Sequence, residues 1–208
     1  MENIITQLNV ITEMLISNVD YGIYLVGFCA SIECINIVTG RKLVVLGIVP
    51  RSPISLIFGP ICSHFIHGSF NHLFFNMIPL FVLSVFMMEK GLAYMVCNTL
   101  MIMYAQSLLL WIIGQRGVHV GASGLIMGYM GYLLYQAYYY PTLSSVILGL
   151  VCIYYFGTAL FSVFPSDEKT SWDGHLCGLA SGVFIAYQAS CVYPFTTVSL
   201  WIVSQISG

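Results

Sequence analysis

The chain has 208 residues, of which 59% are hydrophobic and only 7% are charged, and its net charge is −2. Soluble domains carry about 25% charged residues, so this composition excludes a soluble protein and indicates a polytopic membrane protein. A net charge of −2 without a basic patch also argues against nucleic acid as a partner.

Six apolar runs are long enough to cross a bilayer, which takes about 20 mainly apolar residues. They cover residues 20–38, 69–88, 92–113, 122–139, 142–164 and 174–193. We therefore expect an all-α fold, a single membrane domain over residues 1–208 with a six-helix core at 20–193. Residues 1–19 are expected to form an extension with a short interfacial helix. The other extension, 194–208, holds an apolar piece too short to span.

Residues 39–68 form an unusually long connection between the first two runs. The segment is apolar, but Arg41, Lys42, Arg51 and three prolines interrupt it. Charges and prolines of this kind make a poor membrane span. We expect a structured element that dips into the membrane.

The fourth run is short. From Ser123 to Tyr139 it has 17 residues, about 25 Å of helix at 1.5 Å per residue. The hydrocarbon core is about 30 Å thick. Ser123 is therefore expected below the membrane surface, inside the bilayer slab.

Polar residues open the even-numbered runs. His72 and Asn76 lie near the start of the second, Ser123 near the start of the fourth and His175 near the start of the sixth. Even-numbered spans run in one direction, so their N-terminal ends share one side of the membrane. Polar residues inside spans are costly and mark functional sites. The four side chains are therefore predicted to converge.

Such a cluster has the parts of a serine hydrolase. Ser123 would be the nucleophile and His175 the base that removes its proton. The Ser123 amide, at the positive end of a helix dipole, would help to bind the oxyanion. Further candidates for the oxyanion hole are His72, Asn76, Gly121 and Ala122. Taken singly, each residue also has a structural explanation, because small and polar residues commonly join membrane helices.

Small residues also predict which helices touch. Gly178 and Gly182 form a GxxxG pattern that permits close helix contact. Gly124 belongs to a matching row of glycines on the fourth run. This contact would bring His175 towards Ser123.

Three motifs together resemble the rhomboid family of intramembrane serine proteases. They are "HGSFNHLFFN" (67–76), "GASG" (121–124) and "GHLCGLASG" (174–182), on runs two, four and six. "LGIVPR" (46–51) is similar to the first loop of some members.

The resemblance implies a six-helix rhomboid-type bundle with a Ser123–His175 dyad, no third acid, no cofactor and no metal. His72 and Asn76 match oxyanion residues of the family, and Glu89 matches a carboxylate that we interpret as structural. The expected partners are single-span membrane proteins, as substrates, and the lipid bilayer. Met127 departs from the family, since many members place an aromatic residue there to stack on the histidine.

Two other functions stay open on the sequence. One is a catalytically inactive rhomboid-like protein that binds membrane clients. The other is a membrane transporter or metal carrier that uses His64, His67 and His72, although no second span offers accompanying ligands.

The orientation is ambiguous. Six-span rhomboids keep both termini in the cytoplasm, which would place this protein in a bacterial inner membrane with its site opening to the non-cytoplasmic side. The positive-inside rule favours the reverse. With the termini inside, Lys90 alone is cytoplasmic, whereas the opposite side holds Arg41, Lys42, Arg51, Arg116 and Lys169. We expect the termini inside, because three of these charges lie in the long first loop.

Overall fold

The computed structural model describes residues 4–164 and 171–206, with side chains described up to residue 189. Within these residues the chain forms helices and no strand, apart from one isolated antiparallel bridge between Ile48 and His119. The predicted all-α membrane bundle is confirmed. Lys169 lies outside the described residues.

The described residues form eight α-helices. They are α1 (Ile4–Ser17), α2 (Val19–Val38), α3 (Ser55–Cys62), α4 (Phe70–Met87), α5 (Leu92–Ile113), α6 (Ser123–Tyr139), α7 (Leu143–Phe156) and α8 (Trp172–Ile206). Six of them begin within two residues of a predicted apolar run, whereas α1 and α3 lie outside the runs. Three 3₁₀ turns complete them: η1 (Lys42–Leu46), η2 (Met88–Lys90) and η3 (Gly157–Val163). Among the described residues, four stretches are long and apolar enough to span by themselves: Ile4–Val38, Phe70–Lys90, Leu92–Ile113 and Leu143–Val163.

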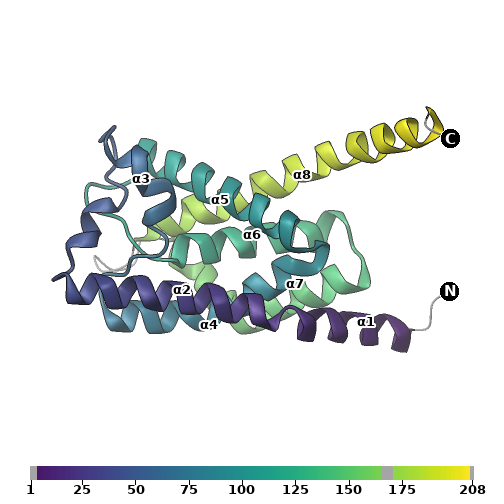
Figure 1. Cartoon of the computed structure of the whole chain (residues 1–208), viewed down its shortest axis with the longest axis horizontal. Coiled ribbons are helices and arrows are strands. Elements are labelled where there is room, and N and C mark those ends of the chain that lie inside the picture. The colour runs from purple at the N-terminus through teal and green to yellow at the C-terminus, as the bar shows by residue number, and fades with distance from the viewer. Residues whose placement is uncertain (1–3, 165–170, 207–208) are drawn as a thin grey trace.

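The N-terminal extension contains the expected short helix, whereas the C-terminal extension differs from the prediction. Only Asn18 separates the short helix α1 from α2. The sixth run was expected to end at residue 193, but α8 continues to Ile206. A helix satisfies its own backbone hydrogen bonds, so it continues past the apolar window without leaving polar groups unpaired. Helix α1 and the C-terminal part of α8 extend from the same end of the bundle, opposite α3 (Figure 1).

Helix α6 forms the centre of the bundle. Every residue from Gly124 to Leu133 is buried, as expected for a helix that is apolar on all sides. It packs against α4, α5 and α7, and most extensively against α8. Met127 lies in this core.

Glycines bring α6 and α8 into backbone contact. A Cβ atom added to Gly178 would lie 2.1 Å from the carbonyl oxygen of Gly124. One added to Gly182 would lie 1.9 Å from the carbonyl oxygen of Gly128. Only glycine permits this approach, which places the start of α8 beside the start of α6.

The long first loop is structured and covers the end of the bundle where α6 begins. It contains η1 and α3, and its backbone bonds to the loop that precedes Ser123. Ile48 and His119 exchange backbone hydrogen bonds of 3.0 and 2.8 Å, and the Gly121 amide donates to the Ser63 carbonyl at 2.8 Å. This network fixes the chain immediately before α6.

Candidate active site

One pocket brings together the polar residues that open α4, α6 and α8. It has a volume of about 540 Å³, and its lining includes His72, Asn76, Ser123 and His175. The remaining lining residues are Gly68, Ser69, Val118, His119, Val120 and Ser171. The four side chains that the sequence placed on one side of the membrane therefore face a shared cavity.

The imidazole of His175 is oriented by the backbone. Its Nδ1 atom lies 3.3 Å from the carbonyl oxygen of Ser162, in η3. A carbonyl can only accept, so Nδ1 carries the proton and Nε2 keeps the lone pair that a base needs. The sequence gives no signal for this contact, because the acceptor is a main-chain atom.

Ser123 is the first residue of α6 and is partly exposed in the pocket. The first amides of a helix have no partner within it, so the Ser123 amide and the positive end of the helix dipole face this region. The neighbouring Gly124 is buried against Gln106, whose Nε2 atom would lie 2.0 Å from an added Cβ. The nucleophile candidate is thus held on a tightly packed turn.

Asn76 presents an unpaired donor. Its side chain is buried and lines the pocket, and its Nδ2 atom has no hydrogen-bond partner. Unpaired buried donors are costly, and in native proteins they commonly serve binding or catalysis. The His72 ring lies over Gly121, where an added Cβ would be 2.4 Å from its Cε1 atom. Gly121 has φ +124°, a region that favours glycine.

The amides of Gly121 and Ala122 are engaged within the protein. Gly121 donates to the Ser63 carbonyl, and Ala122 donates to His67 Nε2 at 3.3 Å. In this structure neither amide is left as an oxyanion donor, because each holds the turn before Ser123 in place. Among the side chains that line this pocket and are described, Asn76 offers an unpaired buried donor, its Nδ2 atom.

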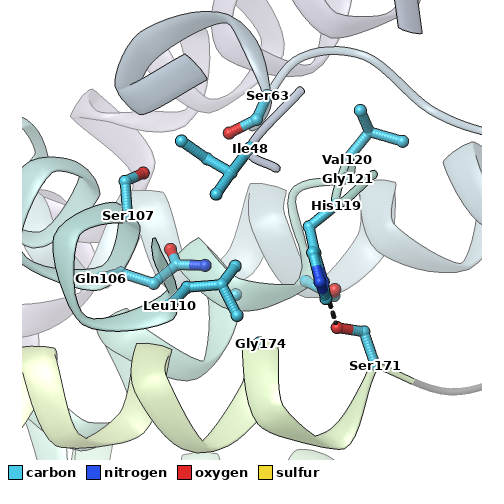
Figure 2. A pocket seen from close by; sticks show the side chains of 12 residues that line it. Ile48, Ser63, Gln106, Ser107, Leu110, His119, Val120, Gly121, Ser171 and Gly174 are labelled. Carbon is cyan, nitrogen blue, oxygen red and sulfur yellow. Dashed lines mark hydrogen bonds between the residues drawn. The ribbon is translucent and has the colours of Figure 1, made fainter. Parts of the chain in front are cut away.

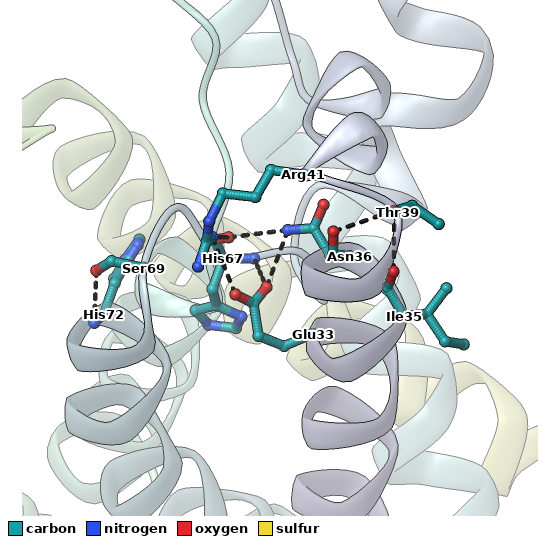
Figure 3. Close-up of polar contacts among 8 residues, drawn as sticks. All are labelled: Glu33, Ile35, Asn36, Thr39, Arg41, His67, Ser69 and His72. Atoms are coloured by element: carbon teal, nitrogen blue, oxygen red, sulfur yellow. Dashed lines mark hydrogen bonds and ion pairs between the residues drawn. The ribbon is translucent and has the colours of Figure 1, made fainter.

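His67 is the centre of a buried polar network that the sequence did not reveal (Figure 3). Glu33, on α2, accepts from the His67 amide at 3.2 Å and pairs with Arg41 at 3.0 Å. Arg41 and Asn36 also donate to the His67 carbonyl, at 3.1 and 3.2 Å. Burial lowers the pKa of His67 to about 4, so at neutral pH the ring is uncharged and can accept from Ala122.

Ser123 also lines a second, smaller cavity, and Figure 2 shows Gln106 and Ser107 beside it. Its volume is about 30 Å³, and its lining includes Gln106, Ser107 and Ser123. Ser107 Oγ is buried without a partner, and Gln106 Oε1 accepts from His64 Nε2 at 2.8 Å. The cavity is polar and large enough to hold a water molecule.

The histidines of the first loop have partners other than a metal. His64 bonds to Gln106, and His67 bonds to the Ala122 amide. The described residues contain no group of three or more histidine, cysteine or acidic side chains that could hold a metal ion. The loop histidines instead connect α3 and the segment before α4 to α5 and α6.

Glu89 does not line the pocket that contains Ser123 and His175. Its carboxylate accepts a hydrogen bond from Ser144 at the start of α7. This contact links η2 to the turn between α6 and α7, which agrees with a structural role.

Comparison with known proteins agrees with this architecture. A family model described as "Rhomboid domain" matches residues 55–190. Uncharacterized proteins from Mycobacterium tuberculosis and Mycobacterium bovis are 34% identical over 168 residues, which cover 76% of this chain and 70% of each relative. An uncharacterized protein from Mycobacterium leprae is 34% identical over 134 residues, which cover 60% of this chain and 53% of that protein. The chain belongs to the rhomboid family.

Proposed function

We propose that this membrane protein is an intramembrane serine endopeptidase in which Ser123 and His175 form the catalytic dyad. The observation that carries the proposal is the shared pocket. It is lined by a serine at a helix N-terminus, by a histidine whose Nδ1 proton is hydrogen-bonded to a backbone carbonyl, and by an asparagine with an unpaired donor. Family membership supports the same reaction.

The proposed reaction follows from these contacts. His175 Nε2 takes the hydroxyl proton as Ser123 Oγ attacks the peptide carbonyl. The negative oxygen that forms is stabilised by the Ser123 amide and by Asn76 Nδ2. His72, beside Gly121, would add a further donor. His175 then protonates the leaving amine and an acyl-enzyme remains on Ser123.

The second half-reaction needs water inside an apolar bundle. The smaller polar cavity that Ser123 lines supports hydrolysis, because Gln106 and the unpaired Ser107 hydroxyl would hold a water molecule beside the nucleophile. His175 would deprotonate this water, which attacks the acyl-enzyme and releases the second product.

The substrates are membrane proteins whose backbone can reach this pocket, and we propose single-span proteins. We further propose that the site opens to the non-cytoplasmic side of a bacterial cell membrane. Arg41 supports this orientation, because its pairing with the buried Glu33 makes it a weaker topological signal than a free loop cation.

Cleavage by purified protein tests the proposal. Detergent-solubilised wild type is incubated with a panel of single-span substrates beside the Ser123→Ala and His175→Ala variants. We expect cleavage by wild type alone, and a double variant no slower than either single one, because the two residues act as a unit. Binding of a substrate without any cleavage would support a client-binding protein instead.

A further inference from the structure

We propose that Asp173 is a positioning residue that fastens the loop before Ser123 to the start of the helix that carries His175. The proposal rests on the Ser123–His175 dyad proposed above. Asp173 is buried two residues before His175, and a buried carboxylate at a membrane helix end needs several partners to remain ionised.

The partners of Asp173 come from both sides of the site. Its Oδ2 atom accepts from the amide of Gln115, in the α5–α6 loop, at 2.7 Å. Its Oδ1 atom accepts from the Ser171 hydroxyl at 2.8 Å and from the Gly174 amide at 2.9 Å. The carboxylate therefore bridges the two segments, and these contacts do not involve the imidazole of His175.

His119 adds a second connection between the same two segments. Its Nδ1 atom lies 2.9 Å from Ser171 Oγ, a contact drawn as a dashed line in Figure 2. Its Nε2 atom donates to the Gln115 carbonyl at 3.0 Å. His119 Nε2 also lies 3.9 Å from Asp173 Oδ2. The Ser171 hydroxyl therefore contacts both the His119 ring and the Asp173 carboxylate, so the three side chains form one network.

The cluster is connected to both members of the dyad. The His175 amide donates to the Ser171 carbonyl at 3.1 Å, so movement of Ser171 moves the first turn of α8. On the other side, Gln115 and His119 belong to the loop that leads into Ser123. Without Asp173 this loop and α8 would lose their shared anchor, and the distance between the nucleophile and the base would be less closely fixed.

Asp173→Asn tests this role with little change in size. A carboxamide has one acceptor oxygen, so it cannot accept from Gln115, Ser171 and Gly174 as the carboxylate does. We expect kcat for a single-span substrate to fall by about 10- to 100-fold, the loss associated with a small misplacement of catalytic groups, while KM stays within about twofold, because Asp173 does not line the substrate pocket. The rate of Ser123 labelling by a fluorophosphonate should fall in parallel.

Two further variants keep the test decisive. Asp20→Asn is the matched control, because Asp20 is exposed and also opens a span; it should retain wild-type kcat. Ser171 is an exposed residue, and Ser171→Ala removes the hydroxyl that contacts Asp173 and His119, so this variant serves if Asp173→Asn does not fold. Ser171→Ala should lower kcat by about 3- to 10-fold. The loss of kcat in the Asp173→Asn, Ser171→Ala double variant should be smaller than the product of the two single losses, since the two residues share one network.

The outcomes separate the two proposals. Wild type that neither cleaves nor becomes labelled would overturn the protease function itself, and the positioning role with it. Active wild type with undiminished kcat in folded Asp173→Asn, or in Ser171→Ala if the former does not fold, would overturn the positioning role alone. A lower Tm with unchanged kcat per folded molecule would do the same, because it would assign Asp173 to stability only.

Discussion

Replacing Gly182 by alanine should damage the protein through the contact between α6 and α8. The added Cβ would lie 1.9 Å from the carbonyl oxygen of Gly128, whereas ordinary contacts begin at 3.4 Å. The helices must therefore separate locally by about 1.5 Å, since the obstructing atom belongs to a helix backbone and cannot rotate away. Overpacking of a core costs about 1–3 kcal/mol, which we expect at its upper end here.

The effect should reach catalysis as well as stability. His175 lies two helical turns before Gly182 on α8, and its base function depends on its distance from Ser123. A misplacement of about 1 Å can slow an enzyme about 100-fold. We expect a Tm lower by about 5–10 °C, from the usual few degrees per kcal/mol in a chain of this size. Substrate cleavage should fall about 10- to 100-fold per folded molecule.

Gly27→Ala is the matched control, because a Cβ at this exposed position on α2 meets nothing within 4 Å. It should leave Tm and cleavage unchanged or raise Tm slightly, since alanine favours helix over glycine. Gly182→Ala with the Tm and cleavage rate of Gly27→Ala would refute the close packing of α6 on α8.

Three further predictions follow from the site and its surroundings. Asn76→Ala should slow cleavage by about 10- to 1000-fold, the cost of losing one oxyanion donor, while Tm is maintained; unchanged cleavage would reduce Asn76 to helix packing. Burial lowers the pKa of His64 and of His67 from 6.5 to about 4, so the unfolded chain takes up protons first as the pH falls. The stability from these neutral histidines should be complete above about pH 6.5 and lost progressively towards pH 4, and a Tm that is flat over this range would contradict it. A C-terminal alkaline phosphatase fusion should be inactive in bacteria and a fluorescent protein fusion bright, whereas an active phosphatase would place the site on the cytoplasmic side.

Hydrophobic length alone predicted most of the helices. The run 92–113 coincides with α5, the run 69–88 exceeds α4 by one residue at each end, and the run 122–139 begins one residue before α6. Bilayer thickness sets these lengths directly. The continuation of α8 to Ile206 was not predictable in this way. The apolar run ends at residue 193, but the backbone hydrogen bonds of the helix continue beyond it.

The alternating direction of the spans was enough to predict which residues share the site, but not which contacts orient their side chains. The parity of the spans placed His72, Asn76, Ser123 and His175 at one end, and all four line one pocket. The contact between His175 and the Ser162 carbonyl, and the bond from the Ala122 amide to His67, join segments distant in sequence through atoms that carry no motif. Asp173 likewise carries no motif, because its partners are main-chain amides and a hydroxyl.

Mapping the residue that a fluorophosphonate modifies tests the central claim most directly. Purified wild type is treated with the reagent, digested and analysed by mass spectrometry, beside the His175→Ala variant and a denatured sample. We predict modification of Ser123 alone, with strongly reduced labelling in His175→Ala and none after denaturation, because only an activated serine reacts. An unmodified Ser123, or equal labelling without His175, would contradict a dyad of these two residues.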